Sequence, residues 1–185
     1  MSVNVLSEAC VIEIDGQRYA HHPNGGGLVA ETAQVDRTAF VGLGAIVKGS
    51  ACVQGWARIT GHACVDGEAC VSDHAEVADE SAVFQQARIS GSAIVRDHAS
   101  VFDQAEVSDC AEIFGGAMVF GHASVAANAR VSGHAAVYGN AQVTGDAWVM
   151  DEAIVCDEAE VRGGAQVRGS QRLASREVVC SESSR

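Results

Sequence analysis

The sequence predicts an all-β solenoid, in which short parallel strands stack in coils around one narrow core. The first observation is an Ala-x-Val frame that repeats every six residues from Ala33 to Val167. The first residue of every hexad is Ala, except at Ser81, and the residue two positions later is always Val or Ile. The second observation is that these hexads contain no insertion, deletion or proline. A period of six does not match the 3.6-residue turn of a helix, so a helical repeat is excluded.

Each hexad combines a short strand with a tight turn. The Ala and the Val lie two residues apart, so their side chains share one face of a strand, while the residue between them points away. Val and Ile favour strands because their χ1 angles are already restricted. Two residues after the Val, most hexads have Gly or Asp, for example Gly49 and Asp73. Both residue types tolerate the backbone conformations of tight turns.

Residues 1–26 precede the frame and predict an N-terminal cap. Two short alternating runs, residues 11–14 and 17–20, flank an Asp15-Gly16 pair. Asp-Gly favours the type I′ turn of a β-hairpin, because both central residues of that turn need a positive φ. We expect this hairpin to cover the exposed strand edge of the first coil. The glycine-rich residues 21–27 predict a flexible connection to the frame.

The frame itself predicts one repeat domain over residues 27–170. Parallel stacking satisfies the backbone of such short strands, because each strand pairs with its equivalents in the coils above and below. After the frame, Leu173 and Val179 keep the aliphatic phase, but Ala is replaced at the intervening positions. Residues 171–185 are therefore a predicted C-terminal cap and tail. Residues 170–180 form either the last coil or a short helix with Ser170 as its N-cap.

The spacing of the frame resembles that of hexapeptide-repeat proteins, in which a small residue follows an aliphatic residue by four positions. Val35 and Ala39 match this pattern, as does each later hexad. The dense, loop-free form of residues 135–147 is most similar to the YdcK-type β-solenoid group. The resemblance implies a single-stranded left-handed parallel β-helix, a triangular solenoid with three hexads per coil. We then expect about 7–8 coils, in which residues 18 apart stack.

Composition and charge exclude several classes of function. The net charge is −12, with 24 acidic and 12 basic residues, so we expect neither nucleic acid nor an anionic membrane as a partner. The N-terminal stretch lacks a signal-peptide pattern, and no apolar stretch is long enough to span a membrane. The seven cysteines occur without a C-x-x-C pair, which predicts reduced thiols in a cytoplasmic protein.

One of the three outer faces is predicted to be apolar. Its larger members recur at intervals of 18 residues, so we expect an aromatic ladder beside a ladder of smaller residues. Stacked rings also stabilise neighbouring coils, but that does not explain their concentration on one side. An apolar stripe is typical of an interface, and we expect a homo-oligomer, a dimer in preference to a trimer. Cover by the terminal segments and an apolar-ligand groove are the other possibilities. The predicted interface residues are Phe84, Phe102, Phe120, Tyr138, Met118 and Ile154.

A column of histidine and glutamate is the candidate for a metal or acid/base site. His62, Glu80 and His98 follow one another at 18-residue intervals on one corner. These side chains can bind a metal ion, but a convex corner does not make ligands converge. We therefore interpret the column as a solvated edge.

The resemblance also implies two enzymatic activities. Some hexapeptide-repeat proteins are acyltransferases that use a histidine base and bind acyl-CoA between subunits, and His122 is the candidate base here. Others are carbonic anhydrases with three zinc histidines. The uninterrupted frame offers no loop to shape a pocket, and its histidines lack the His-x4-His spacing of the anhydrase-like group.

The sequence thus predicts a rigid scaffold or binding module that self-associates through its aromatic face, without a catalytic site or a bound cofactor. An acyl-CoA-dependent transferase is the alternative function. Sequestration of a small ligand in grooves between subunits is a further alternative. The pattern of residues names no substrate, ligand or partner protein.

Overall fold

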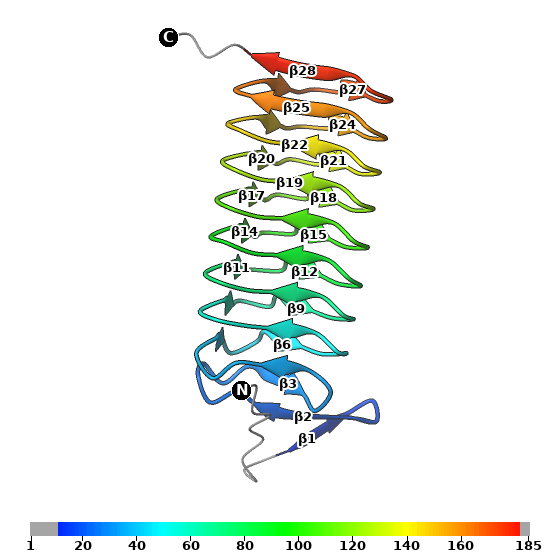
Figure 1. Cartoon of the computed structure of the whole chain (residues 1–185). Helices are drawn as coiled ribbons and strands as arrows, with labels where there is room; N and C mark the ends of the chain where they lie inside the picture. Colours follow the sequence, from blue (N-terminus) through cyan, green and yellow to red (C-terminus); the bar gives the residue numbers. More distant parts are fainter. Residues whose placement is uncertain (1–10, 182–185) are drawn as a thin grey trace.

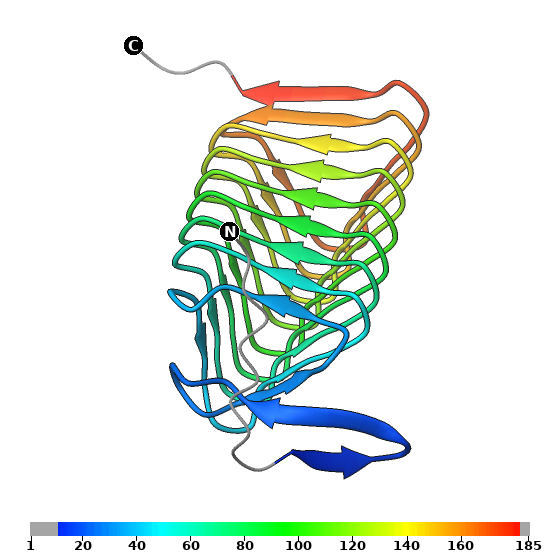
Figure 2. The ribbon, with the colours of Figure 1, turned by 60° about the horizontal axis from the view of Figure 1, so that its bottom comes forward.

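Three sheets wrap one narrow core, so the molecule is a three-sided solenoid (Figure 1 and Figure 2). The computed structural model describes residues 11–181, and every regular element in this range is a β-strand. Strand partners in the frame are 18 residues apart, as for Phe40 and Arg58, so three hexads make one coil. Among these residues there is no helix that is able to cross a membrane. The predicted all-β parallel solenoid is confirmed.

The first sheet, called the aromatic sheet below, holds the N-terminal hairpin and nine coil strands. In order across the sheet, its strands are β1 (Ile12–Ile14), β2 (Gln17–His21), β3 (Leu28–Ala30), β6 (Ile46–Val47), β9 (Cys64–Val65), β12 (Ala82–Val83), β15 (Ser100–Val101), β18 (Met118–Val119), β21 (Ala136–Val137), β24 (Ile154–Val155) and β27 (Arg172–Leu173). The coil strands pair in parallel, whereas the hairpin pairs antiparallel with β3.

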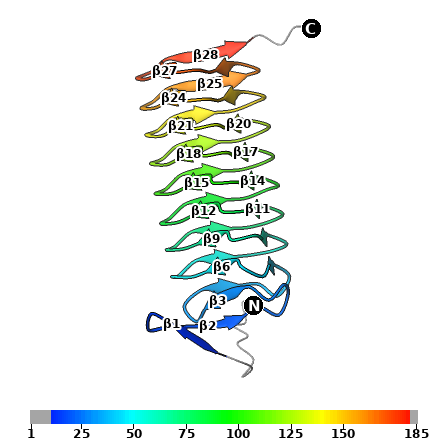
Figure 3. The same ribbon diagram turned by 180° about the vertical axis from the view of Figure 1, so that it is seen from behind.

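The other two sheets are named by their outward side chains. The polar sheet consists of β4 (Gln34–Val35), β7 (Cys52–Val53), β10 (Cys70–Val71), β13 (Arg88–Ile89), β16 (Glu106–Val107), β19 (Ser124–Val125), β22 (Gln142–Val143), β25 (Glu160–Gly163) and β28 (Val178–Ser181). The charged sheet consists of β5 (Phe40–Val41), β8 (Arg58–Ile59), β11 (Glu76–Val77), β14 (Ile94–Val95), β17 (Glu112–Ile113), β20 (Arg130–Val131), β23 (Trp148–Val149) and β26 (Gln166–Val167). Seen from behind, the coils stack evenly from the hairpin to β28 (Figure 3).

The core is a stack of small aliphatic layers. Every frame Ala, Val and Ile from Ala39 to Val161 is buried, and so is Ser81. Burial of one such aliphatic side chain stabilises the fold by about 1.5–3 kcal/mol relative to its exposure. The Ser81 hydroxyl donates to the carbonyl of Ala78 at 2.6 Å, and the carbonyl of Val95 lies 3.2 Å away, so the one polar group at a frame position is satisfied. The frame residues therefore serve structure, and differences between coils lie outside the core.

Aspartates in the turns link each coil to the next. Asp103 adopts a φ of 59°, and its carboxylate accepts a hydrogen bond from the backbone N–H of Gly121 at 3.1 Å. Positive φ explains the preference for Gly and Asp at this turn position. The same bond, from the N–H 18 residues later to a turn carboxylate, is made by Asp73, Asp79, Asp97, Asp109, Asp151 and Asp157. The turns thus add stacking bonds to those of the strands.

The N-terminal hairpin is confirmed, and it covers the first coil. β1 and β2 pair antiparallel across the Asp15-Gly16 turn, in which both residues have positive φ. The connection from His21 to Gly27 was expected to be flexible, and this prediction is wrong. Its backbone bonds to β5, since the N–H of Val41 donates to Asn24 (3.0 Å) and the N–H of Gly27 donates to Val41 (2.8 Å).

The glycines of this connection permit a close approach to β5. A Cβ atom at Gly25 would lie 2.4 Å from the Val41 carbonyl oxygen, and one at Gly27 would lie 2.3 Å from that of Gly42. Real Cβ atoms essentially never approach an oxygen so closely, so both positions need glycine. The glycines therefore provide contact rather than flexibility.

The coil count is nine in the aromatic sheet, not the expected about 7–8. β3 and β27 lie outside the frame, yet Val29 and Leu173 pack against the core. Residues 170–180 form the last coil rather than a helix, because β27 pairs with β24 and β28 pairs with β25. Parallel pairing needs only the backbone and an inward aliphatic residue, so loss of the frame Ala does not end the solenoid.

Candidate functional site

The predicted aromatic ladder forms one continuous ring stack on the outer side of the aromatic sheet. Phe84, Phe102, Phe120 and Tyr138 each follow directly on the end of a strand of that sheet. Successive ring centroids are 4.9, 4.8 and 4.8 Å apart, and their planes differ by 4°, 2° and 11°. This spacing equals the distance between strands, so each ring covers a face of the next. The ring edges remain for contact with other groups.

The surface beside the ladder is also uncharged and mostly apolar, and we call the two together the aromatic face. Its second column comes from the outward strand residues of the same coils, and Met118 is 42% exposed there. The members of this column are Ala82, Ser100, Met118, Ala136 and Ile154. The outward charged residues of the sheet lie beyond the ladder, at Lys48 and Asp66 on one side and Arg172 on the other. The centre of the face is therefore uncharged.

Both ends of the aromatic face finish in polar contacts. At one end, Lys48 Nζ lies 3.3 Å from Asp66 Oδ2, and hydrogen bonding to Asp66 is the main cause of the raised Lys48 pKa. At the other end, the buried Cys156 continues the ladder after Tyr138, and Arg172 Nη2 lies 3.6 Å from its sulfur. A hydrogen bond with Cys156, followed by burial, raises the pKa of the Tyr138 phenol. These contacts mark the limits of the apolar surface.

Aromatic residues on the charged sheet have different surroundings. The Arg58 guanidinium lies 4.9 Å from the Phe40 ring centroid, and that of Arg96 lies 4.5 Å from the Phe114 centroid. Arg96 also pairs with Glu112 at 3.8 Å. Such cation–π contacts cover ring faces that would otherwise be open to water. Guanidinium groups of the charged sheet therefore cover the rings of Phe40 and Phe114.

The histidine and glutamate column lies on an open corner. His98 Nδ1 is 3.3 Å from Glu80 Oε2, and the two side chains are 70% and 65% exposed. Between residues 11 and 181, no three His, Cys, Asp or Glu side chains come together as metal ligands. His62, one coil before Glu80, therefore does not complete a three-ligand cluster with this pair.

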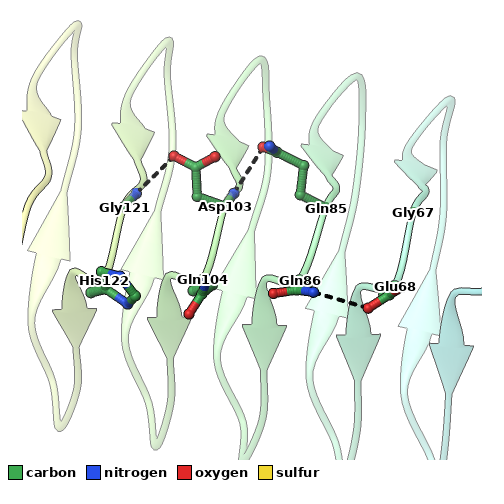
Figure 4. A pocket seen from close by; sticks show the side chains of 8 residues that line it. All are labelled: Gly67, Glu68, Gln85, Gln86, Asp103, Gln104, Gly121 and His122. Carbon is green, nitrogen blue, oxygen red and sulfur yellow. Dashed lines mark hydrogen bonds between the residues drawn. The ribbon is translucent and has the colours of Figure 1, made fainter.

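His122 lies in a groove along the corner between the aromatic and polar sheets (Figure 4). The groove has a volume of about 530 Å3 and is lined by Gly67, Glu68, Gln85, Gln86, Asp103, Gln104, Gly121 and His122. Within it, Gln86 Nε2 donates to Glu68 Oε2 at 3.0 Å. A second hollow of about 480 Å3 shares this column and adds Arg88 and Glu106 from the polar sheet. The site is polar, shallow and adjacent to the ladder.

The three glutamines of this groove were missed by the sequence reasoning. A signal was present, because Gln85 occupies a turn position with a φ of 60° that the repeat usually gives to Gly or Asp. Its side-chain oxygen accepts a hydrogen bond from the N–H of Asp103 at 3.0 Å, which replaces the usual aspartate contact. Gln85 therefore has a structural role that accounts for its unusual position.

Comparison with protein-family models, curated proteins and solved structures found no match for the chain. Its function must accordingly be argued from the surfaces described above. Two of them differ from an ordinary solvated solenoid surface, namely the aromatic face and the groove at His122.

Proposed function

We propose that this protein is a rigid, non-catalytic scaffold of the left-handed hexapeptide-repeat class, which forms a homodimer through its aromatic face. The observation that carries the proposal is the ring stack from Phe84 to Tyr138, which lies on a surface without charged side chains at its centre. A contiguous apolar stripe of this kind is typical of a protein interface. The strands beneath it are paired on both sides, so association would cost little backbone conformational entropy.

The ladder is suited to a closed, two-fold contact. A two-fold axis that lies in the plane of the contact, perpendicular to the ladder and level with the midpoint between Phe102 and Phe120, would place Phe84 of one copy opposite Tyr138 of a second copy. In such an isologous contact each patch meets itself, which closes the assembly at two subunits and prevents growth of a fibre. The uncharged centre allows this pairing, because no like charges are brought together there.

Light scattering coupled to gel filtration tests the proposal. We expect a mass of twice the 19.1 kDa chain for the native protein. Met118→Glu places a charge on the aromatic face without removing a ring, and it should give a monomer. Met150→Glu, the same change beside the charged sheet, is the matched control and should leave the dimer intact. A native protein that stays monomeric at high concentration would contradict the interface.

A second variant, within the ladder itself, tests the same interface independently of Met118→Glu. Phe102→Glu should also give a monomer, because it places a carboxylate within the stack and leaves a desolvated charge at the interface. Circular dichroism should show that the variant keeps its β-sheet signal. A folded Phe102→Glu protein that remains dimeric would place the interface elsewhere.

The transferase alternative is less well supported by the groove at His122. The lining residues include the carboxylates of Glu68, Asp103 and Glu106 but one guanidinium, that of Arg88. This balance disfavours the phosphates of acyl-CoA. Calorimetric titration with acetyl-CoA should therefore give no binding heat. Binding heat that is lost in His122→Ala would favour the transferase over the scaffold.

Ligand sequestration between subunits is the remaining alternative. It requires a small molecule to stay bound in a groove next to the dimer contact. Native mass spectrometry of protein taken directly from cells should show the dimer without added mass. A retained small molecule would instead indicate sequestration.

A further inference from the structure

The register of the polar sheet brings two cysteines together. Cys52 in β7 and Cys70 in β10 are direct partners in a parallel strand pair, and both side chains are half-buried on the outer side of the sheet. Cys64 instead lies on the aromatic sheet, where its partners are Ile46 and Ala82. Of the cysteines in the described part of the chain, Cys52 and Cys70 are thus the two that share a strand pair.

The Cα separation of this pair lies within the range found for disulfides. Neighbouring strands lie about 4.7–4.9 Å apart, which is within the roughly 4.4–6.8 Å that separate the Cα atoms of bonded cysteines. Because the two residues are in register, their Cβ atoms point to the same side of the sheet. The pKa of the Cys52 thiol is raised, first by burial and then by the Cys70 thiol, to which it hydrogen-bonds. The two sulfur atoms are therefore neighbours already in the reduced protein.

We propose that Cys52 and Cys70 form a reversible disulfide that joins two successive coils when the protein meets a peroxide. The Cys70 thiolate attacks one oxygen of hydrogen peroxide, the O–O bond breaks, and Cys70 becomes a sulfenic acid while the first water is released. The Cys52 sulfur then attacks the Cys70 sulfur, the S–O bond breaks, and the second water leaves. Two thiols are oxidised and one peroxide is reduced, so the products are one disulfide and two waters.

The order of the two steps follows from the surroundings of Cys52. Burial holds the Cys52 thiol in its protonated form, and the thiolate is the form that attacks peroxide. Cys70 lines an open hollow together with its strand partner Arg88, so peroxide reaches Cys70 first, and Cys52 resolves the sulfenic acid. A thiol reductant such as glutathione reverses the reaction by exchange.

The disulfide would close a loop of one coil, residues 53–69, next to the N-terminal cap. A cross-link of this size restricts the unfolded chain and opposes separation of the two coils. The bond would lie on the polar sheet rather than the aromatic sheet. It should therefore form equally in the native protein and in Met118→Glu, which makes this inference independent of the proposed dimer.

Peptide mapping after oxidation tests the inference. The native protein is treated with hydrogen peroxide, blocked with N-ethylmaleimide and cleaved with trypsin. Cleavage after Lys48, Arg58 and Arg88 places Cys52 in peptide 49–58 and Cys70 in peptide 59–88. We expect most of the oxidised protein to yield these peptides as one linked species, which is lighter than their sum by two hydrogen atoms. Dithiothreitol should separate them.

Serine variants identify the partner of Cys52. Cys64 shares peptide 59–88, so Cys64→Ser must keep the linked species, whereas Cys70→Ser must lose it. In Cys52→Ser, Cys70 should persist as a sulfenic acid that dimedone traps. Maleimide-modified Cys52 after peroxide treatment of native protein would overturn the inference. So would a linkage that survives in folded Cys70→Ser, or one that forms between separate chains.

Discussion

Two faces of this solenoid carry aromatic side chains, and the rings are covered in different ways. On the charged sheet, the guanidinium groups of Arg58 and Arg96 lie over Phe40 and Phe114. On the aromatic sheet, the four rings cover one another. The cation–π contacts found among residues 11–181 do not involve these four rings. The first arrangement completes its cover within one chain. The second leaves a row of apolar edges, and we infer that a second copy covers them.

The difference arises from which residues follow one another at 18-residue intervals. On the charged sheet, Phe40 is followed by Arg58, and Glu112 by Arg130, so stacking brings unlike groups together. On the aromatic sheet, like follows like over four coils. In a repeat protein, equivalent outward positions of successive coils are neighbours, so a residue type that recurs at one position forms a column along the axis. Alternation therefore produces a solvated face, whereas repetition of one aromatic position produces a surface for association.

Removal of one ring should lower the free energy of unfolding more on the aromatic sheet than on the charged sheet. This is the largest of the expected effects. Phe102 stacks on a ring at each side, whereas Phe114 has one guanidinium contact. Phe102→Ala should lower the free energy of unfolding by about 2–3 kcal/mol, because two stacked pairs and part of the ring's burial are lost. Phe114→Ala should cost less, about 1–2 kcal/mol, because it loses part of the ring's burial and one cation–π contact but no stacked pair.

Urea denaturation measures both values. The two substitutions are made in the monomeric Met118→Glu background, so that the free energy of association does not enter the comparison. Equal losses for Phe102→Ala and Phe114→Ala would remove the distinction between the faces.

Removal of the charged cover should have a smaller effect that depends on salt. Arg96→Ala uncovers Phe114 and breaks the exposed pair with Glu112, so we expect a loss of about 0.5–1 kcal/mol in the free energy of unfolding. The loss should shrink as sodium chloride is added, because salt screens exposed charges. The stability change of Phe102→Ala should not depend on salt in this way. Thermal melting at low and high salt distinguishes the two, and a salt-independent Arg96→Ala would contradict the assigned cover.

Alkaline pH should perturb the end of the ladder, with the smallest expected effect. The pKa of Tyr138 is raised in the folded protein, chiefly by its hydrogen bond with Cys156. Its contribution to stability is thus fully present below the unfolded tyrosine value of about 10, and it is lost as the pH rises through the folded pKa. Tyr138→Phe should flatten this part of the dependence of stability on pH. If native protein and variant lose stability in parallel above this pH, Tyr138 is not the titrating group.

The sequence predicted the strands, and its resemblance to hexapeptide-repeat proteins supplied the register and the ladder. A period of six sets the inward pair of each hexad, and three hexads per coil place Phe84 over Phe102, where the ring centroids are 4.9 Å apart. Each of these features depends on a local pattern repeated without interruption. The number of coils was predicted too low, because the frame Ala is lost at both ends while inward aliphatic residues such as Leu173 continue.

Features that depend on contacts between unlike segments were not predictable in this way. Gly25 and Gly27 suggested flexibility, but they are needed where the connection approaches the backbone of β5. The groove at His122 depends on how Gln86 and Gln104 lie across a corner, which no local pattern specifies. Cys52 and Cys70 are 18 residues apart in the sequence, and the structure shows that they are direct partners in a parallel strand pair.

Small-angle X-ray scattering of the native protein tests the central claim most directly, because it reports both mass and length. Nine coils at the ~4.8 Å strand spacing give a stack of roughly 40–45 Å. Association through the aromatic face sets two solenoids side by side, so we predict a mass of twice 19.1 kDa with the long axis nearly unchanged from that of Met118→Glu. A particle of single mass, or one of double mass and nearly double length, would contradict the account.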